Sequence, residues 1–373
     1  MMNIVRDPHL VVRESNLELY RIILMLAIIA HHYVVNSGLM PILHSHPNSL
    51  KSTFFFIFGM WGKTGINCFV LITGYFMCKS QITLKKFVKL ITEVVFYNML
   101  IFILFIVCGY TVFTWKNCFY AFLPIKSISD GFTSCFLVFY LLIPFLNILV
   151  RNMNQCQHQK LIGLFLFLFT FLGTIPFIDL KMNYIEWFCV LFFISSYIHL
   201  YGLPNNYFTK HIGRVLVGAI VLAILTVIAR VKYEKTPYLF LSDSNHLMAV
   251  VVSVCAFLFF KTIYIPYCKN INTIAKSVFG VFLIHANSDT MRQWLWYDIF
   301  NVKEQYQSHY SILYAVITIA FIFVICIIID YIRILFIERP LFSYMDKIGI
   351  FDKYTTIIKN KMENELFRNN SNY

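Results

Sequence analysis

Charged side chains are scarce in this sequence, and acidic ones are the scarcest. Only 13% of the 373 residues are Asp, Glu, Lys or Arg, with 18 acidic against 31 basic residues. Because a soluble domain carries about 25% charged residues, the composition excludes an ordinary soluble fold. Apolar and aromatic residues take their place: 59% are hydrophobic, and there are 39 Phe and 23 Tyr. The sequence predicts an all-α, polytopic protein embedded in a lipid bilayer.

Several familiar signals are also missing. The ten cysteines are scattered without CxxC or Cys/His ligand spacing, so we expect no disulfide framework and no metal site. No A-x-A-like cleavage site follows the first hydrophobic run, which predicts a retained first span. The net charge of +13 would suggest a nucleic-acid partner in a soluble chain. In membrane proteins, however, Lys and Arg gather in cytoplasmic loops, so we expect no such partner.

Ten windows are apolar over the roughly 20 residues that a membrane-spanning helix needs. They cover residues 19–37, 55–77, 87–108, 132–150, 161–178, 184–201, 212–229, 247–265, 274–291 and 311–335. With the N-terminus inside, the inner segments hold 20 Lys and Arg and the outer segments hold 9, which favours both termini in the cytoplasm. We expect a bundle of about ten helices over residues 1–340 and a polar cytoplasmic tail over residues 341–373.

The first predicted helix carries polar side chains that are expensive inside a bilayer. Arg21 and His32 are eleven residues apart, three helical turns plus about 20°, so both lie on one face, about 16 Å apart along the axis. Each has a structural explanation, since an arginine can snorkel to the interface and a histidine can hydrogen-bond to another helix. Aligned on one face, they predict a path from an anion-binding entrance at Arg21 to a general base at His32.

Two neighbours of this pair are further candidates. Glu18 lies three residues before Arg21, a spacing that suits an ion pair. His31 points about 100° away from His32 on the same helix, and its role stays open. Both residues belong with the predicted path by position, but the spacing favours His32 as the base.

Small and basic residues follow in the second predicted span. Gly62, Gly65 and Gly74 permit close approach between helices, and packing alone would account for them. Lys63 has two interpretations. It either snorkels to the outer surface or contacts a charged acceptor.

Four lysines crowd the next inner turn and the helix after it: Lys79, Lys85, Lys86 and Lys89. Ordinary positive-inside topology explains them well. The alternative is a docking site for a polyphosphate ligand near Arg21. Glu93, four residues after Lys89, is spaced to pair with it, although weakly in that order.

The last two spans add a histidine and an ionic terminus. His285 lies in an apolar span, where a buried, hydrogen-bonded histidine is one explanation and a site residue the other. Asp330 and Arg333 are spaced to pair, and Glu338 follows them. Pro340 is expected to stop the final helix.

In their order along the chain, these motifs resemble the integral-membrane acyltransferase family 3, particularly bacterial O-acetyltransferases of surface polysaccharides. SNLELYRIILMLAIIAHH is similar to the family's first helix, whose Arg and His map to Arg21 and His32. GINCFVLITGYF is similar to its second motif, which maps to Thr73, Gly74 and Tyr75. LKKFVKLITEVVFYN is similar to its basic segment, AKSVFGVFLIHA to its histidine stretch, and IERPL to its closing Glu-Arg/Lys-Pro.

The resemblance implies about ten core helices and a multi-pass protein of the bacterial plasma membrane. It implies acetyl-CoA as the acyl donor, used from the cytoplasmic side. The acceptor would be a sugar hydroxyl of a capsular or envelope polysaccharide or of its lipid-linked precursor. Two departures stand out: Thr73 replaces the usual Ser but keeps a hydroxyl, and Lys86 and Lys89 replace paired arginines, losing the bidentate fork.

Together, residues and resemblance predict an O-acetyltransferase with His32 as general base and Thr73 or Tyr75 as oxyanion donor. The residues expected to hold the donor are Arg21, Lys85, Lys86 and Lys89. Direct transfer and an acyl-histidine intermediate both stay open. The same polar stripe would suit a glycan transporter or flippase, although the symmetry between halves that such proteins often show is not found in the sequence. A purely structural envelope protein is the third alternative.

Overall fold

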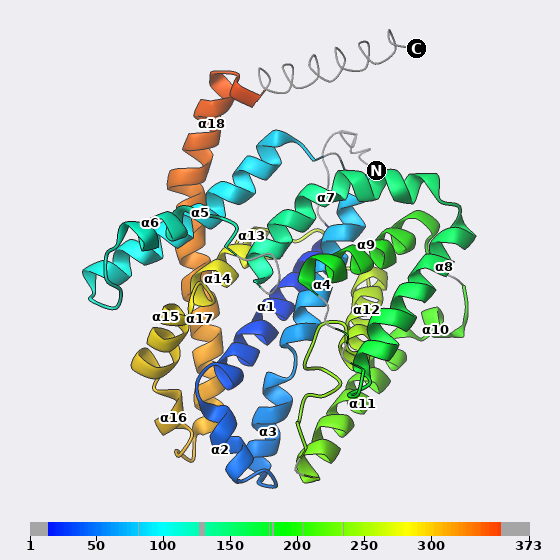
Figure 1. Cartoon of the computed structure of the whole chain (residues 1–373), viewed down its shortest axis with the longest axis horizontal. Helices are drawn as coiled ribbons and strands as arrows, with labels where there is room; N and C mark the ends of the chain where they lie inside the picture. Colours follow the sequence, from blue (N-terminus) through cyan, green and yellow to red (C-terminus); the bar gives the residue numbers. More distant parts are fainter. Residues whose placement is uncertain are drawn as a thin grey trace, which may run out of the picture.

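The structure is a computed structural model, and it describes residues 14–80, 82–126, 131–178, 180, 183–203, 205–233 and 235–351. Over these residues every regular element is helical, which confirms the predicted all-α fold. Seven helical segments of the described chain are long and apolar enough to cross a membrane. They assemble into one multi-pass bundle (Figure 1).

Six of the seven candidate spans lie before residue 233. They are α1 (Ser15–Val35), α3 with α4 (Leu50–Gly59 and Gly62–Met77), α5 (Leu84–Val107), α7 (Phe132–Asn152), α9 (Tyr184–Tyr201) and α11 (Ile212–Lys232). The seventh joins α17 (Ser311–Arg333), η3 (Ile334–Glu338) and α18 (Arg339–Lys347). A shorter apolar helix, α12 (Leu247–Thr262), packs against α4 and α11.

Short helices occupy the connections. They are α2 (Leu39–Ser45), α6 (Trp115–Phe122), α8 (Gln155–Phe165), η1 (Leu166–Leu172), α10 (Tyr207–Lys210), α13 (Lys269–Lys276), α14 (Val278–His285), α15 (Asp289–Gln293), η2 (Trp294–Ile299) and α16 (Val302–Gln305).

Three of the ten predicted windows are not among the seven candidate spans, and one of them, 247–265, holds the shorter helix α12. Window 161–178 holds the end of α8 and the π-helical η1, and window 274–291 is divided among α13, α14 and α15. The sequence of α13, KNINTIAK, is too polar for the bilayer interior. Ser288 then starts a new helix, because its Oγ accepts a hydrogen bond of 3.2 Å from the backbone N–H of Met291. The count of ten spans and the cytoplasmic termini stay predictions.

The expectation that Pro340 stops the last helix is wrong. Pro340 stands in the first turn of α18, where its missing N–H costs little. The π-helical η3 precedes it, and this wider turn replaces the regular α-helical bonding that a proline ring disrupts. The helix therefore crosses the predicted boundary at residue 340, and the tail beyond residue 351 lies outside the described residues.

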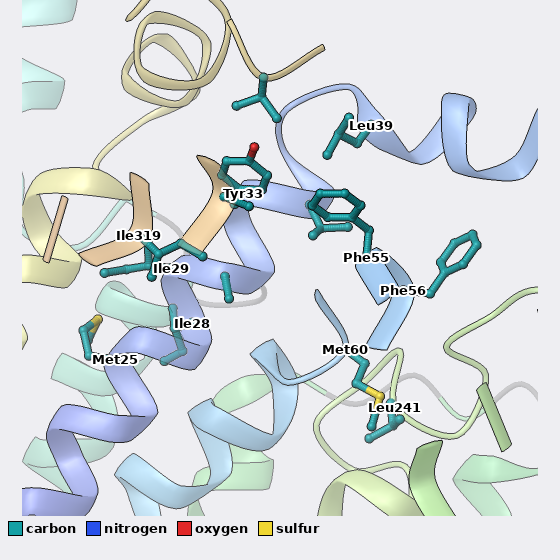
Figure 2. Packing of buried hydrophobic residues seen from close by; sticks show 14 of the residues in the cluster. Met25, Ile28, Ile29, Tyr33, Leu39, Phe55, Phe56, Met60, Leu241 and Ile319 are labelled. Atoms are coloured by element: carbon teal, nitrogen blue, oxygen red, sulfur yellow. The ribbon is translucent and has the colours of Figure 1, made fainter. Parts of the chain in front are cut away.

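Helix α1 lies at the centre of the packing. It contacts α3, α4, α12, α13, α14 and α17. Its side chains Met25, Ile29 and Tyr33 are buried in one cluster with Ile319 of α17 and Phe55 of α3 (Figure 2). The rings of Tyr33 and Phe55 stack with their centroids 6.2 Å apart. A helix surrounded on this scale presents its polar side chains to other helices rather than to lipid.

The bundle has two distinct ends. At one end, Lys85 at the start of α5 pairs with Asp346 of α18 at 2.7 Å, and Asn147 near the end of α7 donates to the carbonyl of Met77 at 3.1 Å. We name this the basic end. The opposite, distal end carries α2, α3 and α16 (Figure 1). There the hydroxyls of Ser52 and Tyr306 lie 3.1 Å apart.

Candidate active site

Two cavities lie inside the bundle, lined by α1, α4, α5, α7 and the α13–α14 segment. The arginine chamber, about 390 Å³, lies toward the basic end. Its polar lining consists of Arg21, Thr73, Lys86, Lys89, Glu93, Tyr140 and Lys276. The histidine chamber, about 330 Å³, contains the side chains of His31 and His32. Ligand-binding pockets begin at about this size, roughly 300 Å³.

The two chambers share a wall of four apolar side chains: Ile28, Ile66, Phe132 and Phe282. The rings of Phe132 and Phe282 meet edge to face with their centroids 5.0 Å apart. Ile28 lies on α1, seven residues after Arg21 and four before His32. The face of α1 that the sequence singled out therefore lines two adjoining chambers, with an apolar partition between its two polar groups.

His32 forms a hydrogen bond with a second histidine. The Nδ1 of His285 lies 2.6 Å from the carbonyl oxygen of Val281, which can only accept, so this nitrogen carries the proton. Neutral His285 then has its lone pair on Nε2, which lies 3.1 Å from Nδ1 of His32. His32 donates to it through Nδ1–H, and neutral His32 keeps its own lone pair on Nε2. This tautomer suits His32 to accept a proton.

His31 lines the same chamber but has a different partner. Its Nδ1 lies 2.6 Å from the carbonyl oxygen of Gly59, to which the neutral ring donates. The ring packs directly on Gly62, where an added Cβ would overlap it. Close packing recurs at Gly74, where an added Cβ would overlap the hydroxyl of Ser195 in α9. The glycines thus bring α4 against its neighbours, and His31 is held by backbone.

The arginine chamber gathers most of the predicted donor-binding residues. Nη1 of Arg21 lies 3.2 Å from both carboxylate oxygens of Glu18, which confirms that pair. Lys86 also lines the chamber and donates to Ser80 at 3.1 Å. Lys85 lies apart from the cavity, because it pairs with Asp346 on the exposed surface of the basic end. Lys86 and Lys89 therefore line the same chamber as Arg21, whereas Lys85 does not.

A buried ionic cluster lies behind this chamber. Arg333 contacts Asp330 at 2.8 Å, Glu338 at 2.9 Å and Glu93 at 3.1 Å, and its own side chain is only 4% exposed. Lys89 pairs with Glu338 at 2.6 Å. The predicted Arg333–Asp330 pair is therefore confirmed, whereas Glu93 is bound by Arg333 of a distant helix and not by Lys89. Because Glu93 and Lys89 also line the chamber, the cluster fixes part of its wall.

The two proposed oxyanion donors do not lie together. Thr73 lines the arginine chamber, but its hydroxyl donates to the carbonyl of Phe69 at 2.8 Å. Tyr75 lines neither chamber. Its ring packs on His199 with a centroid distance of 4.5 Å, and the ammonium of Lys261 lies 5.1 Å from its centroid. We therefore assign Tyr75 no part in the site.

Sequence reasoning missed much of the polar lining of the histidine chamber. The missed residues are Asn98, Lys126, Thr133, Ser134, Tyr184, Asn287 and Arg292. Asn287 donates to the side-chain oxygen of Asn98 at 3.1 Å, which joins α5 to the end of α14. An asparagine inside the apolar run FYNMLIF is a signal that could have pointed to Asn98. Lys126 gives no such signal, because it lies in an ordinary connection.

Comparison with protein-family models matches residues 14–331 to the family described as the acyltransferase domain, of the acyltransferase 3 type. The matched stretch contains every lining residue of both chambers. No curated protein and no solved structure matches the chain significantly.

Proposed function

The chain belongs to acyltransferase family 3, and we propose that it transfers an acetyl group from acetyl-CoA to a hydroxyl of a bacterial envelope or capsular polysaccharide or of its lipid-linked precursor. The observation that carries this proposal is the pair of adjoining chambers. One presents cations at the basic end, and the other presents a histidine in a base-competent tautomer. Donor and acceptor would enter from opposite ends and meet at the shared wall.

The arginine chamber suits the donor. Arg21, Lys86, Lys89 and Lys276 line it, and arginine and lysine are the side chains that bind phosphate groups. The balance of Lys and Arg along the sequence favours a cytoplasmic basic end, where a cytosolic thioester would arrive. The apolar remainder of the chamber, including Phe69 and Phe136, suits the thin pantetheine arm, with the nucleotide held outside.

In the histidine chamber, His32 would take the hydroxyl proton of the sugar on Nε2 while the hydroxyl oxygen attacks the thioester carbonyl carbon. The new C–O bond forms, the C–S bond breaks, and the electron pair leaves on the CoA sulfur. The proton held by His32 then returns to that thiolate, giving CoA and the acetylated sugar. His285 acts as a positioning residue, since its Nε2 accepts the Nδ1–H of His32.

Transfer requires the partition between the chambers to admit the thioester. Phe282 is only partly buried, and its ring centroid lies 6.3 Å from that of His32. A rotation of this side chain would open the wall beside the base. The alternative route, an acyl-histidine intermediate, needs the same opening, so trapping of labelled protein before acceptor is added distinguishes the two.

The test uses purified protein in liposomes with labelled acetyl-CoA and a base-treated, O-deacetylated envelope glycan. We expect CoA release that depends on the glycan, together with label in an ester on the glycan. A transporter or flippase would move the glycan without releasing CoA, and that result would overturn the proposal. Plasma-membrane location is checked by fractionation of the producing cells.

A further inference from the structure

The histidine chamber is strongly basic. Lys63, Lys126 and Arg292 line it, and its described lining residues include no Asp or Glu. Two carboxylates near these cations stand mainly in solvent. Asp289, 2.8 Å from Arg292, has a side chain that is 96% exposed, and Asp243, 3.7 Å from Lys63, is 55% exposed. Water screens exposed carboxylates of this kind, so the chamber keeps a positive potential.

Within the part of the chain that the structure describes, two of these cations have hydrogen-bond donors without an acceptor. The Nε of Arg292 is buried and has no hydrogen-bond partner within the described chain. Partial burial lowers the pKa of Lys126, and no charged neighbour among the described residues offsets this effect. A buried donor without an acceptor costs free energy, which a ligand with acceptor atoms would recover.

The rest of the polar lining suits hydroxyl groups. The amides of Asn98 and Asn287 are fixed by their mutual hydrogen bond of 3.1 Å, and the hydroxyl of Tyr184 accepts from Lys63 at 2.5 Å. Fixed amides and hydroxyls are groups that orient a small ligand in a pocket. A chamber of about 330 Å³ leaves room for about one sugar unit beside the histidines, so the cations would face that unit itself.

We propose that the acceptor is an acidic sugar, whose carboxylate or phosphate is bound by Lys126 and Arg292 while the hydroxyl to be acetylated faces His32. This inference rests on the proposed function and names the chemical class of its acceptor. An anion at this position would use the orphaned donor of Arg292 and offset the positive potential of the chamber. Lys63, which also lines the chamber and is hydrogen-bonded to Tyr184, would add to the attraction.

The first test offers three forms of one glycan to the protein in liposomes with labelled acetyl-CoA. The O-deacetylated envelope glycan is used in three forms. Its acidic groups are left intact (the untreated form), its carboxyl groups are reduced to alcohols, or its phosphates are removed. We expect the untreated form to be labelled and one of the two modified forms to lose at least about tenfold in kcat/KM, because a hydrogen bond to a charged group is worth that much. The form that fails identifies the anion.

Equal labelling of all three forms would overturn the acidic-sugar inference and leave the acetyltransferase intact. Absence of labelling from all three would remove the proposed function and this inference with it. The two failures are therefore distinguishable.

The second test asks whether Lys126 and Arg292 are the residues that bind the anionic group of the acceptor. Lys126→Gln and Arg292→Gln should each raise KM for the untreated glycan about tenfold while leaving KM for acetyl-CoA unchanged, and Lys126→Arg should recover most of the loss. The matched control is Lys116→Gln, since Lys116 is exposed on α6 and lines neither chamber. An unchanged KM for the glycan in both variants, or an equal rise with the anion-free glycan, would contradict the assignment.

Discussion

Arg333 offers the sharpest test of how the bundle is held together. Its guanidinium contacts three carboxylates within 3.1 Å, and the side chains of Arg333 and Asp330 are 4% and 0% exposed. In Arg333→Leu, Glu338 would keep Lys89, and Asp330 would keep only the hydroxyl of Tyr97 at 2.8 Å. Glu93 would lose its ion-pair partner. Stranding buried charges in this way costs about 3–5 kcal/mol of unfolding free energy.

The assay is equilibrium unfolding in mixed micelles, followed by tryptophan fluorescence. The control is Lys85→Met, which removes an exposed pair with Asp346 and should cost at most about 1 kcal/mol. Adding Asp330→Asn to Arg333→Leu removes one stranded charge and should restore part of the loss. If Arg333→Leu costs no more than Lys85→Met, then Arg333 does not neutralise these carboxylates, and the role given to the cluster is wrong.

Three further predictions concern the chambers. In steady-state assays, His285→Ala should lower kcat about tenfold or more and alter the pH profile of kcat, because His32 loses its hydrogen-bond acceptor. His285→Gln should recover part of the rate, and an unchanged pH profile in His285→Ala would contradict the positioning role. Gly62→Ala should displace the ring of His31 and cost about 1–3 kcal/mol in the same unfolding assay, whereas Gly218→Ala, with open space around it, should cost nothing. Ile28→Phe should block acetyl transfer at the shared wall, while calorimetry should show that the variant still binds acetyl-CoA. The control is Ile23→Phe at an exposed position of the same helix, which should transfer the acetyl group at the wild-type rate.

The sequence predicted those parts of the molecule that depend on local spacing. The all-α membrane fold follows from apolar runs of sufficient length. The common face of Arg21 and His32 follows from helical periodicity, and so does the pair of Arg21 with Glu18. These features need no knowledge of which helices meet.

Contacts between distant helices could not be predicted in the same way. His32 and His285 are 253 positions apart, and nothing in either segment specifies that their nitrogens meet. Spacing predicts only a weak pair between Glu93 and Lys89, and Glu93 pairs instead with Arg333 of the last span, which is buried beside it. Tyr75 follows Thr73 by two positions, and two positions along a helix turn a side chain toward the opposite face. Tyr75 therefore points away from the chamber that Thr73 lines.

The most direct test of the central claim is the rate of acetyl transfer by His32→Ala. The variant is reconstituted at equal folded concentration with the wild-type protein, and acetyl-CoA affinity is measured alongside. Loss of a general base should lower the rate about 10²–10⁴-fold while acetyl-CoA binding stays unchanged, because the proposed function places the donor in the other chamber. Transfer to the glycan at the wild-type rate would contradict the account.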